Sequence, residues 1–198
     1  YGLSTASWVS VDNFDVDQDK QLNSSPYAPT TNLSLKSILK KLNLQHKNVF
    51  LDLGCGKGRV LLFAITEGFK YIRGVEFSPI LQNIAKKNCE QFLAKKCLSQ
   101  QKRRQKLRQQ IQILEMDARD YQFLGDEGII FMFDPFSKEV LKTVIKNMKK
   151  SLAEQKNNLT IIYRSPVHKE LFDRDSDFSL ILEEVSWGHD FSVYNLKC

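Results

Sequence analysis

The sequence predicts an α/β protein built on a single doubly wound sheet, parallel for most of its width and closed by an antiparallel hairpin. Five short apolar runs alternate with segments of helical period, and two more runs flank a short glycine-containing turn near the end of the chain. Alternating strands and helices give a parallel sheet covered on both faces, whereas strands joined by a tight turn pair antiparallel. The length of 198 residues suits one compact domain.

Seven runs of β-type residues are the candidate strands, and the segment ahead of them has a different character. The strands are expected at residues 48–53, 71–77, 111–116, 128–133, 159–164, 178–187 and 191–196. Residues 1–30 contain none of these runs. We expect them to form a lead-in that packs on a domain formed by residues 31–198.

Apolar periodicity and capping residues place the helices between the strands. Ser78 followed by Pro79 starts a helix, because serine caps free backbone amides and proline suits the first turn. No Pro or Gly occurs from residue 80 to residue 124, so this helix either continues to Arg108 or breaks near residues 97–100. Ser137 can cap the next helix, whose buried face would hold Val140, Leu141, Val144, Ile145 and Met148.

Positive charge is concentrated in one segment of the chain. Residues 95–108 hold seven Lys and Arg side chains, and no acidic residue occurs from 91 to 114. Without those seven charges the formal net charge of +6 becomes −1. The segment is either a solvated helix end or a docking surface for an anionic macromolecule. It has no aromatic residue for stacking on single-stranded bases, which favours non-specific phosphate contact or an acidic protein partner.

The cysteines and the hydropathy exclude several classes of protein. Cys55, Cys89, Cys97 and Cys198 form no C-x-x-C pair and lie near no histidine cluster, so we expect neither a metal site nor a disulfide framework. No apolar stretch approaches the roughly 18–20 residues of a membrane-spanning helix. We therefore expect a cytoplasmic monomer with reduced thiols and no membrane partner.

The strongest functional signal is a glycine-rich turn after the first strand. Gly54, Gly56 and Gly58 follow this strand directly and precede a helical segment. Glycines let the backbone turn sharply and let a ligand lie against it. Glu76 lies 22 residues after Gly54, close to the roughly 20 expected for an acid that binds ribose hydroxyls. Together these features predict a ligand that contains a nucleoside.

Asp52 decides between two nucleoside-bearing cofactors. A dinucleotide-binding turn reads G-x-G-x-x-G and holds a pyrophosphate, whereas this chain reads G-x-G-x-G with a carboxylate two residues ahead of it. That carboxylate would repel a pyrophosphate. S-adenosylmethionine has no phosphate and carries a cationic amine beside a sulfonium, so the residues favour it over NAD.

Four short motifs resemble those of class I methyltransferases. The first two are residues 52–58 and 74–76. Met116-Asp117-Ala118 resembles the third motif, which contacts adenine, and residues 133–136 resemble the fourth, at the mouth of the active site. The lead-in is similar to that of a bacterial group of uncharacterised methyltransferases, and more loosely to that of seven-strand protein-lysine methyltransferases. The resemblance implies the strand order 3-2-1-4-5-7-6, with strand 7 antiparallel.

The resemblance also implies roles for individual residues. The set expected to bind S-adenosylmethionine is Asp52, Gly54, Cys55, Gly56, Gly58, Glu76, Asp117 and Ala118, with Tyr27 and Thr30 either closing over the cofactor or setting the direction of the first helix. Asp134 would hold the target nitrogen and Phe136 would pack on the acceptor. The second proline usual in this motif is absent here, and the alternative for Asp134 is to cap the following helix.

The implied activity is methyl transfer to a nitrogen, with a protein favoured as the acceptor. Three alternatives stay open at this stage. The acceptor could be a nucleic acid or a small molecule, or the chain could be a non-catalytic S-adenosylmethionine-binding module that recruits a partner through residues 95–108.

Overall fold

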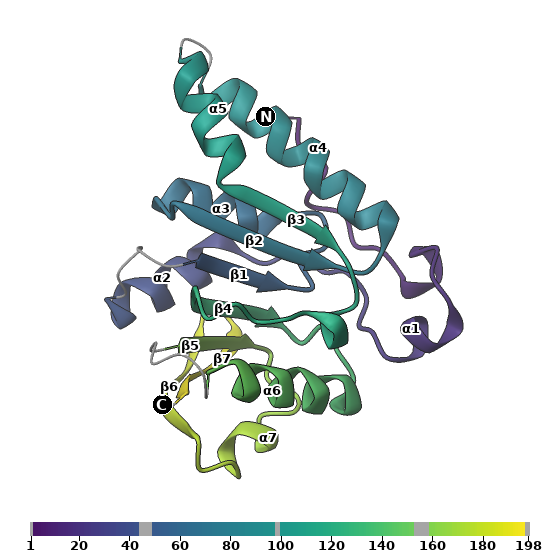
Figure 1. The fold of residues 1–198 in the computed structure, drawn as a ribbon, viewed down its shortest axis with the longest axis vertical. Coiled ribbons are helices and arrows are strands. Elements are labelled where there is room, and N and C mark those ends of the chain that lie inside the picture. Colours follow the sequence, from purple (N-terminus) through teal and green to yellow (C-terminus); the bar gives the residue numbers. More distant parts are fainter. Residues whose placement is uncertain (1, 44–48, 98–99, 153–158, 197–198) are drawn as a thin grey trace.

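Seven strands form one sheet in the order β3-β2-β1-β4-β5-β7-β6, as Figure 1 shows. The structure is a computed structural model, and it describes residues 2–43, 49–97, 100–152 and 159–196. Strands β1 to β5 pair in parallel, and β7 lies between β5 and β6 and is antiparallel to both. The predicted strand order is therefore confirmed, including the antiparallel seventh strand.

The strands lie where the apolar runs predict them, with small differences at their ends. They are β1 (Val49–Leu53), β2 (Tyr71–Glu76), β3 (Ile111–Glu115), β4 (Glu127–Phe133), β5 (Leu159–Arg164), β6 (Phe178–Ser186) and β7 (His189–Leu196). Position 48, predicted to be part of the first strand, lies outside the described residues. Strand β4 begins one residue earlier than predicted, because Glu127 is buried in an ion pair with Arg73 of β2.

Helices cover both faces of the sheet, as a doubly wound fold requires. On one face lie α2 (Asn32–Leu42), α3 (Arg59–Glu67) and α4 (Pro79–Lys96), and on the other lie α6 (Lys138–Leu152) and the short α7 (Glu170–Asp173). Each face has its own cluster of buried side chains. The predicted inner face of α6 is buried in full: Val140, Leu141, Val144, Ile145 and Met148. No helix among the described residues is long and apolar enough to cross a membrane.

The chain after Ser78 forms two helices, which settles the choice that the sequence leaves open. Ser78 caps α4 by accepting a hydrogen bond from the Leu81 amide, and α4 ends at Lys96. A second helix, α5 (Gln101–Gln109), returns the chain to the start of β3. One helix continued to Arg108 would span roughly 45 Å and carry the chain past the sheet. The break is needed because β3 must pair with β2.

The lead-in crosses the carboxyl ends of the parallel strands and contains the short helix α1 (Gln18–Leu22) and the 3-10 turn Val11–Asn13 (Figure 1). Hydrogen bonds at several points attach it to the domain. The Ser78 hydroxyl donates to the Phe14 carbonyl, and the Asn88 side chain exchanges two hydrogen bonds with the Ser4 backbone. The Ser25 amide donates to the Pro135 carbonyl. The lead-in therefore lies over the edge of the sheet at which the glycine turn is located.

Candidate cofactor and active site

The glycine turn between β1 and α3 has a backbone that only glycine accepts comfortably. Gly54 and Gly56 have φ angles of 79° and 52°, in the left-handed region. A Cβ atom on Gly54 would lie 2.6 Å from the Cβ of Pro135, and one on Gly56 would lie 2.3 Å from the Tyr27 ring. The turn is therefore enclosed between the end of β4 and the lead-in.

Two buried carboxylates stand beside this turn. Glu76, at the end of β2, accepts hydrogen bonds from the Gly56 amide at 2.8 Å and from the Ser78 amide at 2.9 Å. Each of its oxygens keeps a further lone pair for a ligand. Burial raises the pKa of Glu76 to about 7. Asp52 on β1 is also buried, and no donor among the described residues reaches its carboxylate.

Ionising both buried carboxyl groups is unfavourable in free energy when no ligand is bound. Burial raises the pKa of Asp52 well above its ordinary value, and the nearby Glu76 carboxylate raises it further. No lysine or arginine among the described residues forms an ion pair with either group. Buried acids without a cation favour a ligand that brings positive charge and hydroxyl donors.

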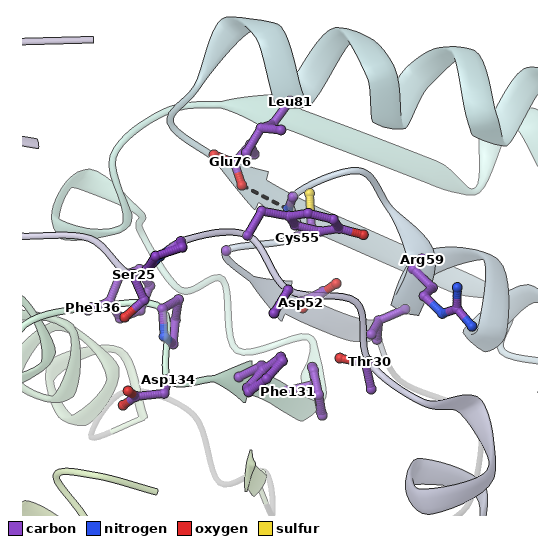
Figure 2. A pocket seen from close by; sticks show the side chains of 18 of the residues that line it. Ser25, Thr30, Asp52, Cys55, Arg59, Glu76, Leu81, Phe131, Asp134 and Phe136 are labelled. Carbon is purple, nitrogen blue, oxygen red and sulfur yellow. Dashed lines mark hydrogen bonds between the residues drawn. The ribbon is translucent and has the colours of Figure 1, made fainter. Parts of the chain in front are cut away.

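A pocket joins the turn, the two acids and the lead-in, and Figure 2 shows its side chains. Asp134 and Phe136 lie on one side of it and Arg59 on the other, with Asp52 between them. The space between these side chains is about 850 Å³, a figure that includes solvent at its open mouth. Its lining includes Pro135 of the fourth motif and nine of the predicted site residues: Asp52, Gly54, Cys55, Gly56, Glu76, Tyr27, Thr30, Asp134 and Phe136.

Tyr27 and Thr30 contribute the wall that the lead-in forms. The Tyr27 ring packs on Gly56, its hydroxyl donates to the Thr5 carbonyl at 2.8 Å, and the Lys57 ammonium lies 5.2 Å from the ring centre. Thr30 is buried just before α2. Both residues therefore line the pocket, and their part in closing over the cofactor or in directing the chain into α2 stays a prediction.

Asp134 follows β4 in a strained conformation. Its φ of 36° is unusual for a residue other than glycine, and such strain is often found at functional sites. Its Oδ1 accepts a hydrogen bond from the Tyr163 hydroxyl at 2.7 Å, and burial raises its pKa. The α6 helix is instead capped by Ser137, whose hydroxyl accepts from the Val140 amide at 3.5 Å. The capping alternative for Asp134 does not describe this geometry.

Three predicted residues lie away from the pocket lining. Gly58 packs against Ala85 of α4, at the start of α3. Asp117 and Ala118 lie just past β3, near Glu76 at the same edge of the sheet. The Asp117 carboxylate is engaged by Arg119, through both a backbone amide and a side-chain ion pair at 2.8 Å. A role for these residues in cofactor binding stays a prediction.

The structure also shows residues that the sequence analysis missed. Arg59 lines the pocket and has a buried Nε with no partner among the described residues. It directly follows the glycine turn, which is the signal that could have found it. Phe14 and Phe131 line the pocket as well. Their sequence contexts, a polar lead-in and an apolar strand, predict only ordinary core residues and give no sign of a binding site.

The strand order, the glycine turn and the acid at the end of β2 together define a class I methyltransferase, whose methyl donor is S-adenosylmethionine. The chain belongs to the DOT1 family: the model described as "Histone methylation protein DOT1" matches residues 7–197. A search of curated protein sequences finds no match.

Solved structures of other methyltransferases share the fold. An RNA methyltransferase from Salinibacter ruber, in complex with S-adenosyl-L-homocysteine, is 15% identical with a TM-score of 0.58, over 86% of this chain and 94% of that one. Ribosomal protein L11 methylase from Lactobacillus delbrueckii subsp. bulgaricus is 16% identical with a TM-score of 0.57, over 88% and 82%. TrmN from Thermus thermophilus is 17% identical with a TM-score of 0.57, over 85% and 49%. At these identities the likeness concerns the fold alone.

Proposed function

We propose that this protein transfers a methyl group from S-adenosylmethionine to a nitrogen atom of a positively charged polypeptide. The observation that carries the cofactor assignment is the pair of buried acids, Asp52 and Glu76, beside a glycine turn. At Gly54 and Gly56 this turn has no room for a Cβ atom. Glu76 has lone pairs left for ribose hydroxyls. Asp52 is a buried carboxyl with no cation beside it among the described residues, and the cationic end of the cofactor would favour its ionised form.

Arg59 adds a group suited to the carboxylate of the same cofactor. Its guanidinium lies across the pocket from Asp134, and its one hydrogen bond to a described residue is a long one, from Nη1 to the Thr5 hydroxyl at 3.5 Å. A carboxylate bound there would receive the fork-shaped donor set that arginine offers. The pocket thus presents an acid for the amine and a base for the carboxylate of one amino-acid group.

At the acceptor end, Asp134 is the group that can hold a nitrogen and take its proton. S-adenosylmethionine, when bound, supplies an electrophilic methyl group. A lysine with an ordinary pKa of about 10.4 is protonated at neutral pH and must lose a proton before its nitrogen can react. Burial raises the pKa of Asp134, which makes it a better proton acceptor, and Tyr163 fixes the position of its Oδ1.

Charge around the pocket supports a cationic acceptor over a nucleic acid. Between Phe14 and Ser25, which both line the pocket, the chain carries Asp15, Asp17 and Asp19 against one base, Lys20. The three aspartates are exposed, and two of them form ion pairs, Asp17 with Lys20 at 3.4 Å and Asp19 with Arg119 at 2.8 Å. Among the described residues Asp15 forms no ion pair, so the rim keeps a negative charge that favours a lysine- or arginine-rich segment over phosphate groups. The family's description as histone methylation proteins and the ribosomal protein L11 methylase agree with a protein acceptor. The RNA methyltransferase that shares the fold has, by its name, a different acceptor class.

Calorimetry tests the cofactor assignment. S-adenosylhomocysteine is expected to bind with micromolar affinity, and Asp52→Ala and Glu76→Ala should each weaken it at least tenfold, equal to about 1.4 kcal/mol. NADH serves as the control ligand. Binding of NADH without binding of S-adenosylhomocysteine would refute the assignment.

The acceptor class needs a separate test. Tritium transfer from labelled cofactor is measured into a lysate separated into protein, RNA and small molecules. Label is expected in basic proteins, and a variant with Asp15, Asp17 and Asp19 changed to Asn should label them more slowly without losing cofactor affinity. Label found only in RNA or in small molecules contradicts the proposed acceptor.

A further inference from the structure

Helix α5 and the second half of α4 form a basic hairpin, defined here as residues 86–97 and 100–108. It holds nine Lys and Arg residues and one acid, Glu90. Figure 1 shows the hairpin projecting beyond the sheet. Helix α4 begins at Pro79, next to its cap Ser78, whose amide donates to Glu76, and its 18 residues carry the chain about 27 Å from the pocket. The hairpin is therefore a surface separate from the proposed active site.

The side chains of α5 are arranged in rows. Leu107 packs inward against the core. On the outer face, Gln101, Gln105 and Gln109 recur every four residues and are all exposed. Residues at this spacing form one line along a helix. Lys102 and Lys106 form a parallel row on one side of the glutamines, and Arg104 and Arg108 form a row on the other.

These charges differ from the lysines of α6, which also lie on an exposed helix face. On α6, Lys138, Lys142 and Lys149 form ion pairs with Glu170, Glu139, and Asp175 and Asp177. On α5, Arg108 pairs with Glu90, but no ion pair within the described residues involves Lys102, Arg104 or Lys106. Most of the α5 charge is therefore available to an external anion.

We infer that α5 binds double-stranded DNA by lying in the major groove. That groove is about 12 Å wide and admits a helix about 10–12 Å across. The two basic rows would face the two phosphate walls, and the glutamine row would face base edges, where glutamine pairs with adenine. An RNA duplex has a deep, narrow major groove that side chains cannot read. The absence of aromatic residues from 93 to 120 argues against single strands.

The test measures binding to a fluorescent 20-base-pair DNA duplex by anisotropy, between about 50 and 200 mM salt. The first variant changes Lys102, Arg104, Lys106 and Arg108 to Gln. The matched control removes four charges from α6 instead: Lys138, Lys142, Lys146 and Lys150 to Gln. A single change, Gln105→Glu, places a negative charge in the centre of the proposed contact. Circular dichroism and thermal unfolding confirm that each variant is folded.

The parent is expected to bind the duplex with a steep salt dependence. The α5 variant should bind at least tenfold more weakly. The slope of log binding constant against log salt concentration should be smaller in magnitude by about 3–4, since each phosphate contact contributes about 0.9 to that slope. Gln105→Glu should weaken binding at least fivefold, and the α6 control less than twofold. The inference fails if the parent does not bind the duplex, or if the α6 control loses as much affinity as the α5 variant. It also fails if an RNA duplex, single-stranded DNA or polyglutamate binds as tightly as duplex DNA.

Discussion

Asp134 is the residue in which strain, burial and pocket position coincide. Asp134→Ala is expected to lower turnover about a hundredfold or more, within the usual range for an acid–base group, while S-adenosylhomocysteine affinity changes little. Single-turnover kinetics and calorimetry give the two quantities. Tyr163→Phe removes only the hydrogen bond to Oδ1 and should lower turnover less. If affinity and turnover fall together, Asp134 is part of the cofactor site and not the proton acceptor.

Arg164 at the end of β5 is buried without the partners that a buried charge needs. Its Nε and Nη1 have no acceptor among the described residues, and its guanidinium lies 3.8 Å from the centre of the Phe133 ring. Burial lowers its pKa to about 10. Because unpartnered buried donors cost about 1–3 kcal/mol, Arg164→Met should leave the free energy of unfolding unchanged or raise it.

Arg73 provides the contrast to Arg164 in the same sheet. Its guanidinium pairs with Asp126 and Glu127, each at 3.0 Å. Removing one partner of a buried pair costs about 3–5 kcal/mol, so Arg73→Met should strongly destabilise the protein. Urea unfolding measures both variants. A loss in Arg164→Met as large as that in Arg73→Met would show that Arg164 has a stabilising partner.

Among the elements, the lead-in and α4 depend on each other through Asn88. Its buried side chain accepts from the Ser4 amide at 3.0 Å and donates to the Ser4 and Lys57 carbonyls at 3.3 and 3.0 Å. It therefore ties the start of the lead-in to the loop that contains the glycine turn. Lys57 strengthens the same link by donating to the Ser7 carbonyl at 3.0 Å.

Asn88→Ala is expected to lower the free energy of unfolding by about 1–3 kcal/mol, because it leaves buried backbone groups without partners. It should also weaken S-adenosylhomocysteine binding, since Tyr27 reaches Gly56 only while the lead-in stays in place. Asn83, exposed on the same helix, is the matched control, and Asn83→Ala should change stability by less than about 0.5 kcal/mol. Urea unfolding and calorimetry are the measurements. Equal effects of the two changes would rule out a specific link.

For the whole molecule, the sequence was sufficient to predict the architecture and most of the pocket. Strand positions follow from local apolar runs, and the acids Asp52, Glu76 and Asp134 follow from their places at strand ends, which parallel topology brings to one edge. The sequence could not predict contacts between distant segments. Tyr163 reaches Asp134 across 29 positions, and Arg73 reaches Glu127 across 54. Such pairs depend on side-chain packing in three dimensions, which no local pattern contains.

The break between α4 and α5 shows a related limit. Helix propensity alone allows either one long helix or two, because the segment contains neither Pro nor Gly near residue 100. The pairing of β3 with β2 decides the matter, since the chain must return to the sheet at Ile111. The choice is therefore made by tertiary structure and not by the residues at the break.

Stability of the cofactor-free protein should depend on pH through its two buried acids. Glu76 has a pKa of about 7 in the folded protein against an ordinary value of 4.5, so the folded state holds a proton that the unfolded chain releases between these values. The contribution is favourable below about pH 4.5 and is lost as the pH rises through 7. Asp52 acts in the same direction because its pKa is also raised.

Relative to Glu76→Gln, which does not titrate, the parent should lose at most about 3 kcal/mol of stability between pH 5 and pH 8. Urea unfolding of both proteins across this range measures the difference, with Asp175→Asn as a control because the pKa of that acid is lowered and it stays ionised throughout. Parallel stability curves for the parent and Glu76→Gln would mean that Glu76 is ionised over the whole range.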